Sequence, residues 1–305
     1  MSGGGMTGRG TTVGPIKVAV LGTGIMGAPM AANLLAAGFP VTVWNRSAQK
    51  ALALVEKGSA LAPDARSALE TVDIAITMLA DGPTVDAVLF GPDQAANALR
   101  PGALLIDMSS IPPATARTHA ERLAARGVGY LDAPVSGGEV GAKAGTLAIM
   151  AGGTQADFDR ALPVFTPLGR ATRVGPAGAG QVAKLCNQAI VGITIGAVAE
   201  ALLLAEAAGA DPRAVQAALA GGFADSRILQ IHGSRMIDRT FVPGGKVSTQ
   251  LKDMATIVGL AREHGLELPF SELTRGLYET LVGRGDGGRD HAALFLEIAA
   301  RNGRA

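Results

Sequence analysis

The sequence of 305 residues has one cysteine, few aromatic residues and almost no net charge. Cys186 has no second cysteine to pair with, so an internal disulfide and a metal site of several cysteines are both excluded. The lack of disulfides fits a reducing compartment, and we expect a cytoplasmic protein. A formal net charge of +1 gives no reason to expect binding to nucleic acid or to an anionic membrane.

Hydrophobic stretches of membrane-spanning length are also scarce. Residues 185–204 form one apolar stretch, but four polar side chains interrupt it: Asn187, Gln188, Thr194 and Glu200. We therefore expect a buried helix of a soluble protein there rather than a membrane span. The first 16 residues are rich in glycine and threonine and lack the apolar core of a secretory signal. They predict a disordered leader over residues 1–16.

Short β-branched segments alternate with helical patterns from Lys17 onward. Helices are predicted over residues 25–37 and 48–57. The strands are predicted at 17–21 (KVAVL), 41–44 (VTVW), 73–79 (DIAITML), 103–108 (ALLIDM) and 129–133 (GYLDA). Strands that are joined by helices imply crossover connections and a parallel sheet. The pattern therefore predicts a doubly wound, Rossmann-type α/β domain.

The pattern changes after Gly153. A helix is predicted over residues 155–162, the stretch GPAGAG follows at 175–180, and no further strand is expected beyond it. Residues 181–208 predict one long helix, and Asp211-Pro212 suit the start of the next. We therefore expect an α/β domain over 17–176 and an all-helical domain over 177–305, joined by the long helix.

Three glycines follow the first strand and open the first helix. Gly22 permits a tight turn, Gly24 lets a pyrophosphate approach the backbone, and Gly27 lets helix and strand pack closely. The helix start also offers N–H groups to phosphates. A plain tight turn is the alternative, but the strand before and the helix after favour dinucleotide binding. The predicted contacts include the residues between the glycines, Thr23, Ile25 and Met26.

The end of the second strand indicates which dinucleotide binds. A carboxylate there would hold the ribose hydroxyl of NAD, but the sequence reads Trp44-Asn45-Arg46-Ser47. Arg46 can pair with a 2′-phosphate, and Ser47 can add a hydrogen bond. The alternative is that Asn45 to Ser47 only cap the next helix. We expect NADPH to be preferred, with NAD still open.

Lys184, Asn187 and Gln188 share one face of the long helix, because they stand at i, i+3 and i+4. Lys184 lies near the start of that helix, where the helix dipole and burial would both lower the pKa of its ammonium group. Such a lysine can give a proton to a carbonyl oxygen while hydride reaches the carbon. Asn187 could hold the lysine or the substrate hydroxyl. The alternative is an ordinary surface lysine.

Ser136-Gly137-Gly138 follow a predicted strand end, in the crevice where doubly wound sheets bind ligands. The N–H groups of paired glycines can form a nest for an anion, and Ser136 adds a hydroxyl. A simple turn is the competing interpretation. The sequence therefore favours a carboxylate-binding loop at this position.

Several segments in order resemble the β-hydroxyacid dehydrogenase family, with Thr23 at a position more often held by leucine. They are VLGTGIMGAPMAAN, TMLADGPTVDAVLFG, LIDMSS, LDAPVSGGEVGAKAGTLAIMAGG, GAGQVAKLCNQ and QLKD. The resemblance covers nearly the whole chain after Lys17. Within the family, DMSS, DAPVSGG and KLCNQ look most like the tartronate semialdehyde reductases.

The resemblance implies roles for individual residues. Lys184 would be the catalytic lysine with Asn187 as its partner, and Ser136, Gly137 and Gly138 would grip the substrate carboxylate. Lys252 would close on the cofactor, and Asp253 would line the substrate site. Further cofactor contacts are implied at Met78, Leu79 and Ser110. An exposed charge pair is the alternative for Lys252 and Asp253, and Asp290-His291 match a family segment to which no role is assigned.

We therefore expect an NADPH-preferring reductase of a small semialdehyde acid, foremost tartronate semialdehyde to glycerate, without a metal. It would form a homodimer or homotetramer through the helical domain. Alternatives within the family are a 3-hydroxyisobutyrate dehydrogenase and a glyoxylate or succinic semialdehyde reductase. An imine reductase has a similar architecture, but such enzymes generally lack the lysine, so Lys184 argues against this alternative. A non-catalytic NADP-binding regulatory protein is the alternative of another class, and it could lose Lys184 freely.

Overall fold

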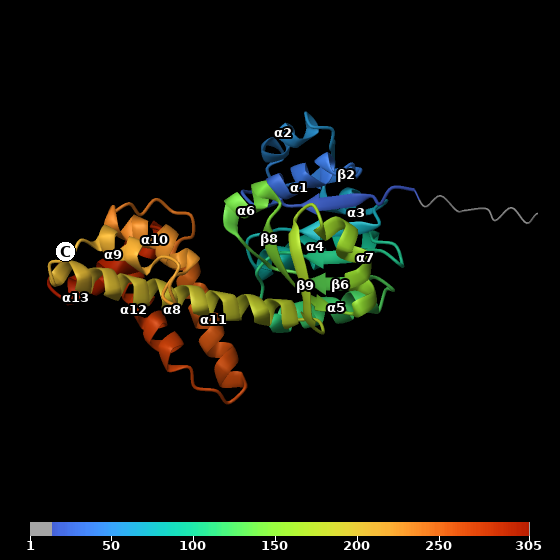
Figure 1. Cartoon of the computed structure of the whole chain (residues 1–305). Coiled ribbons are helices and arrows are strands. Elements are labelled where there is room, and N and C mark those ends of the chain that lie inside the picture. The colour runs from blue at the N-terminus through green and yellow to red at the C-terminus, as the bar shows by residue number, and fades with distance from the viewer. Residues whose placement is uncertain (1–13, 305) are drawn as a thin grey trace, which may run out of the picture. The chain divides into compact units, whose positions relative to one another are not determined.

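The computed structural model describes residues 14–304, which fall into two compact units that meet in the sequence between Gly178 and Ala179 (Figure 1). Residues 1–13 of the predicted leader lie outside the described part. At its end, Ile16 already packs against the core of the first unit.

The first unit is built on one sheet, which has nine strands in the described residues. Its order is β3-β2-β1-β4-β5-β6-β8-β7, with β9 paired to β8. The strands are β1 (Val18–Leu21), β2 (Val41–Trp44), β3 (Ala60–Leu61), β4 (Ile74–Thr77), β5 (Leu104–Asp107), β6 (Gly129–Asp132), β7 (Val135–Ser136), β8 (Leu147–Gly153) and β9 (Gly169–Gly175). β1 to β6 pair in parallel, whereas β8 runs antiparallel to β6 and β7.

The Rossmann-type parallel sheet is confirmed, and five predicted strands are present as β1, β2, β4, β5 and β6. β3, β7, β8 and β9 are not predicted by the sequence pattern. The sheet is therefore mixed rather than wholly parallel, because the chain turns back after β7 and β8 pairs antiparallel with both β6 and β7.

Helices and short 3-10 turns connect the strands. They are α1 (Gly27–Ala36), η1 (Ala48–Ala51), α2 (Leu52–Val55), α3 (Ala65–Leu69), α4 (Gly82–Phe90), η2 (Ala95–Ala98), α5 (Pro113–Ala124), α6 (Gly138–Ala144) and α7 (Gln155–Phe165). The helix predicted over 48–57 is only the short pair η1 and α2. Alternate residues of β1 enter two separate apolar clusters, Val18 and Val20 in one, Ala19 and Leu21 in the other. Both faces of the sheet are therefore covered.

The second unit contains helices and no named strand in its described residues, and one isolated bridge joins Lys246 and Asp290. Its elements are α8 (Ala179–Ala207), α9 (Pro212–Leu219), α10 (Arg227–Ile237), α11 (Val247–Glu263), α12 (Pro269–Gly283), η3 (Asp286–Gly288), η4 (His291–Ala293) and α13 (Leu294–Arg301). α9 to α13 all contact α8, which is the central helix of the unit (Figure 1). The predicted long helix is thus confirmed, and Asp211 caps α9 through the N–H of Arg213.

α8 is long and apolar enough to cross a membrane by length and composition alone, and it is the one helix of the described residues that is. The central helix of a soluble protein meets the same criteria, because its apolar face packs against other helices. Ile195, Ala199 and Leu202 of α8 are buried in the apolar core of this unit.

The turn between β1 and α1 depends on two glycines. Gly22 has a φ of +102°, and a Cβ atom there would lie 2.4 Å from the carbonyl oxygen of Met78. A Cβ atom on Gly27 would lie 1.9 Å from the carbonyl oxygen of Gly22. Only glycine permits α1 to begin this close to the turn.

Gly27→Ala should therefore lower the free energy of unfolding by about 1–3 kcal/mol, as overpacking does. Gly24→Ala is the matched control, since a Cβ atom there meets nothing within 4 Å. It should leave stability within about 0.5 kcal/mol of the wild type. Urea unfolding without cofactor measures both, and equal stability of the two variants would contradict the packing described.

Candidate functional site

The glycine loop after β1 presents an open backbone surface. Gly24 and Ile25 are exposed, and space is free where a side chain on Gly24 would stand. Gly27 begins α1 directly after the loop, and Met26 lies half-buried between them. A dinucleotide pyrophosphate needs such a bare backbone beside a helix start, so these residues fit the group.

Asn45 ties the glycine loop to the end of β2. Its Oδ1 accepts the N–H of Thr23 at 3.1 Å, and its Nδ2 donates to the carbonyl oxygen of Ser47 at 3.0 Å. Thr23 is buried and Ser47 is exposed at the start of η1, where its side chain makes no cap hydrogen bond. The side chain of Ser47 therefore does not cap η1. Asn45 joins the glycine loop to the loop that follows β2.

Arg46 is exposed next to Asn45, and within residues 14–304 it forms no ion pair or hydrogen bond. The positions around it, from Trp44 to Lys50, contain no acidic residue. The strand end therefore offers a free guanidinium to a ligand and no carboxylate that would repel a phosphate.

A buried carboxylate links the ends of β4 and β5. Asp107 Oδ1 accepts from the hydroxyl of Thr77 at 2.8 Å and from the N–H of Ser109 at 3.0 Å. The hydroxyl of Ser109 in turn accepts the N–H of Leu79 at 3.0 Å. Burial raises the pKa of Asp107, and the hydrogen bonds from Ser109 and Thr77 oppose that effect. These contacts hold the loop that contains Met78 and Leu79 against β5.

Ser110 in this loop is the cofactor contact expected from the sequence. Ser109 and Asp107 were not expected there. Ser110 is half-buried, whereas Ser109 is fully buried and makes the hydrogen bond to Leu79. For Asp107 alone, the signal available was its position at a strand end, where a buried acid needs donors.

Ser136 ends β7, and the two glycines after it start α6. Gly137 and Gly138 have φ values of +136° and +60°, which L side chains rarely adopt. Asn33 of α1 donates to the carbonyl oxygen of Ala142 in α6 at 2.8 Å. The predicted carboxylate loop is therefore tied to the same helix that starts at the glycine loop.

Lys184 lies in the second turn of α8 and is half-buried. Burial lowers the pKa of its ammonium group below the usual value, and Lys252 acts in the same direction. Asp253 opposes this effect and raises the pKa. Lys184 is therefore easier to deprotonate than an exposed lysine, yet it keeps a carboxylate as its electrostatic partner.

Asp253 is held by α8 and by its own neighbour. Gln188 Nε2 donates to Asp253 Oδ2 at 2.7 Å, and Lys252 Nζ lies 3.2 Å from Asp253 Oδ1. Asn187, expected to contact Lys184 or the substrate, donates to Gln188 Oε1 at 2.9 Å. Gln188 shares the helix face that the sequence indicated, but its contact with Asp253 could not be read from spacing within one helix.

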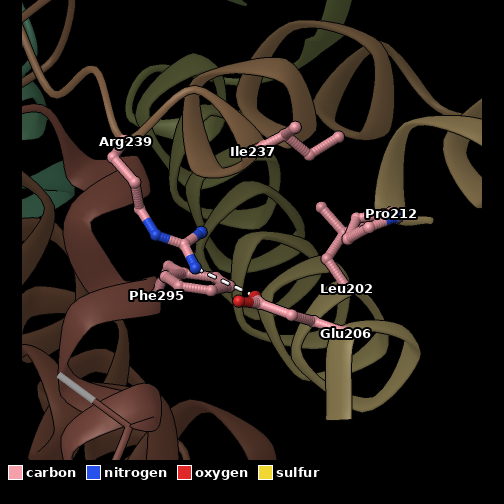
Figure 2. A pocket seen from close by; sticks show the side chains of 6 residues that line it. All are labelled: Leu202, Glu206, Pro212, Ile237, Arg239 and Phe295. Atoms are coloured by element: carbon pink, nitrogen blue, oxygen red, sulfur yellow. Dashed lines mark hydrogen bonds and ion pairs between the residues drawn. The ribbon is translucent and has the colours of Figure 1, made fainter. Parts of the chain in front are cut away.

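A separate pocket of about 200 Å³ lies between helices of the helical unit (Figure 2). Its lining is formed by Leu202, Glu206, Pro212, Ile237, Arg239 and Phe295. Arg239 donates to Glu206 at 2.9 Å and lies 4.1 Å over the ring of Phe295. Leu202 is about 27 Å along α8 from Lys184. None of the predicted site residues therefore lines this pocket. Its two charged residues, Arg239 and Glu206, form an ion pair with each other.

Two family models match successive parts of the chain. A model of the NAD binding domain of 6-phosphogluconate dehydrogenase matches residues 17–178. A model of the NAD-binding region of NADP-dependent 3-hydroxyisobutyrate dehydrogenase matches residues 178–297.

Similar proteins match over almost their whole length. The 2-hydroxy-3-oxopropionate reductase of Escherichia coli K12 is 44% identical, over 94% of this chain and 99% of its own. A solved structure of Mycobacterium tuberculosis 3-hydroxyisobutyrate dehydrogenase with L-serine is 30% identical, with a TM-score of 0.85 over 93% of this chain and 99% of its own. A structure of Psf3 with NADP+ and 2-OPP is 25% identical, with a TM-score of 0.82 over 92% and 99%.

These matches agree with the glycine loop, the sheet and the lysine-bearing helix described above. The chain therefore belongs to the 3-hydroxyisobutyrate dehydrogenase-like family of β-hydroxyacid dehydrogenases, enzymes that use NAD or NADP to act on the hydroxyl groups of hydroxy acids.

Proposed function

We propose that this enzyme is an NADPH-preferring, cytoplasmic reductase that converts tartronate semialdehyde to glycerate, with Lys184 as the general acid. The observation that carries the mechanism is the half-buried Lys184, whose pKa is lowered by burial while the charge of Asp253 acts against that shift. The high identity to the E. coli 2-hydroxy-3-oxopropionate reductase, whose substrate is tartronate semialdehyde under another name, supports the choice of substrate.

The chain's own residues would divide the work between binding and proton transfer. The nicotinamide, when bound, supplies the hydride. The hydroxyl of Ser136 and the backbone N–H groups of Gly137 and Gly138 would hold the substrate carboxylate. Lys184 would give its proton to the carbonyl oxygen as negative charge develops there. Asp253 would favour the protonated lysine, and Gln188 would keep Asp253 in place.

The cofactor contacts follow from the first unit. Gly22, Gly24 and Gly27 would admit the pyrophosphate, with Thr23, Ile25 and Met26 completing the loop. Met78, Leu79 and Ser110 would lie along the dinucleotide, and Lys252 of the helical unit would reach it. The free guanidinium of Arg46, with Ser47 next to it, supports a preference for the 2′-phosphate of NADPH.

A 3-hydroxyisobutyrate dehydrogenase is the second candidate, because a solved structure of that name is similar over nearly the whole chain. The two activities differ in the small group attached to the carbon next to the carboxylate, and such pockets discriminate through few contacts. Values of kcat/KM for tartronate semialdehyde, methylmalonate semialdehyde, succinic semialdehyde and glyoxylate would decide between them. The absence of turnover with every one of them would favour a non-catalytic NADP-binding protein.

Arg46→Asp should weaken NADPH use and improve NADH use, because it removes a charged hydrogen-bond donor and adds repulsion. We expect kcat/KM for NADPH to fall roughly 10- to 100-fold. Lys57→Asp, the same charge change at an exposed position after α2, should leave the cofactor ratio unaltered. If the wild type uses NADH as well as NADPH, the proposed role of Arg46 is wrong.

Lys184→Ala should lower kcat about 10²–10⁴-fold while NADPH binding is retained, since the glycine loop and Arg46 are untouched. Lys184→Arg should restore little, because a guanidinium keeps its proton at neutral pH. Single-turnover kinetics and cofactor titration measure the two effects. Near-normal turnover in Lys184→Ala would remove this lysine from the mechanism.

The rate of reduction should also fall as pH rises, because the proton donor is lost when Lys184 deprotonates. Since the pKa of Lys184 is lowered, the fall should begin below the usual lysine range. Oxidation of the hydroxy acid should show the opposite dependence, because it needs the neutral amine. Matching pH profiles in both directions would contradict the role of Lys184.

A homodimer or homotetramer built through the helical unit is also expected. Ile190 and Leu204 of α8 are 67% and 69% exposed, which leaves apolar surface on the central helix. Light scattering at micromolar concentration should give a mass of at least two chains. A monomer mass would contradict this proposal.

A further inference from the structure

Asp290, at the start of η4, is a completely buried carboxylate with no part in the proposed mechanism. Its Oδ2 accepts the N–H groups of Gly244 at 2.8 Å and Gly245 at 3.2 Å, and a guanidinium N–H of Arg235. Its Oδ1 accepts the N–H of Ala292 at 3.1 Å. Burial raises the pKa of Asp290, but these hydrogen bonds and a neighbouring histidine hold it well below the usual range. The group is therefore a charged centre that collects N–H donors.

A metal ion is the first alternative for this cluster, because ligand atoms of His232, Asp290 and His291 lie within 4.8 Å of one another. A carboxylate offers about four lone-pair positions. Three backbone N–H groups and Arg235 already supply four donors to this carboxylate, and the guanidinium brings positive charge next to the cluster. These contacts disfavour a cation and favour a structural role.

The loop that Asp290 holds leads directly into α11. The N–H of His291 donates to the carbonyl oxygen of Gly245 at 2.8 Å, and the N–H of Val247 donates to that of Arg289 at 2.9 Å. No side chain caps the start of α11. The position of its first turn therefore depends on the loop around Asp290.

His291 also reaches α8 through the buried side chain of Gln250 in α11. The carbonyl oxygen of Gln188 can only accept, so the amide nitrogen of Gln250 faces it, at 3.1 Å. The amide oxygen then faces Nδ1 of His291, 3.4 Å away, which must carry the proton. Burial is the main cause that lowers the pKa of His291 to about 4, so the ring is neutral at neutral pH. Gly192 leaves room for this contact, since a Cβ atom there would lie 2.7 Å from Gln250 Nε2.

Gln188, which accepts the hydrogen bond from Gln250, also holds Asp253. The backbone of Gln188 accepts from Gln250, and its side chain donates to Asp253 at 2.7 Å. Asp253 lies one turn after Gln250 on α11, so α8 and α11 are joined at two successive points. Lys184 lies on α8 and Asp253 on α11, so the register of these two helices affects how close the two charges are.

We propose that Asp290 and His291 are positioning residues, which act through Gln250 and Gln188 to keep Asp253 beside Lys184. The inference rests on the proposed role of Lys184 as proton donor, but its geometry can be tested without turnover.

Two variants interrupt the chain of contacts at different points. His291→Phe keeps the ring and removes Nδ1, and Gln250→Met keeps the length of the side chain and removes the amide. Gln216→Met is the matched control. Gln216 of α9 donates to the carbonyl oxygen of Leu229 in α10 at 2.8 Å, and a Cβ atom on Gly233 would lie 3.0 Å from its amide nitrogen. It is thus the same kind of contact between helices of this unit, outside the proposed path.

With substrate, kcat should fall about 10-fold in His291→Phe and in Gln250→Met, as for a misplaced catalytic group, while the Kd for NADPH stays unchanged. The double variant should be no slower than either single one, because both remove the same link. Gln216→Met should keep the wild-type kcat even though its thermal stability falls. The proposal would be overturned if kcat fell in proportion to thermal stability in all three variants, the control Gln216→Met included.

A readout without substrate separates this inference from the proposed function. The folded protein is treated with an acylating reagent at one pH. Mass spectrometry then measures the rate at which Lys184 itself is labelled. Loss of the carboxylate partner should favour the neutral amine and raise that rate roughly twofold or more in both variants, toward that of Asp253→Asn. The control should label like the wild type. Labelling at the wild-type rate in His291→Phe and Gln250→Met would overturn the inference, even if the reductase activity itself is established.

Discussion

Parallel strand pairing in register is the constraint on which the first unit depends. It aligns the last residues of five strands, namely Leu21, Trp44, Thr77, Asp107 and Asp132. The glycine loop, the Arg46 loop and the Met78 loop all leave the sheet at this edge, where doubly wound folds bind their ligands. Backbone pairing thus decides which loops are neighbours. Thr77 and Asp107 add a side-chain hydrogen bond because the register places them opposite each other.

In the helical unit, glycines and the glutamine amides packed beside them have the corresponding role. Gly192 of α8 and Gly233 of α10 each leave room for a glutamine of another helix, whose amide donates to a backbone carbonyl. A buried amide must find a partner, and only one register of the two helices supplies it. Apolar packing among Ala and Leu side chains tolerates small sliding motions more readily. The amide contacts can therefore specify the position of a catalytic group more closely than the apolar core does.

Much of the candidate site was open to prediction from local patterns. The glycine spacing, the absence of an acid after β2 and the face shared by Lys184 and Gln188 are all properties of a few neighbouring residues. Ser109, Gln250 and the contact of Gln188 with Asp253 were not predictable in this way. Their partners lie 30 to 65 positions away along the chain. Nothing in the local sequence distinguishes buried Ser109 from half-buried Ser110.

The sequence by itself determined the alternation of strands and helices, the glycine turn and the long central helix, because each depends on periodicity and on backbone freedom over a short stretch. Only the tertiary structure decided that β8 runs antiparallel to β6, that Gln188 contacts Asp253, and that Asp290 collects four N–H donors instead of standing as an isolated acid. A buried polar group takes whichever partner the fold brings within hydrogen-bond distance. That distance is set by the packing of whole elements, which no local pattern contains.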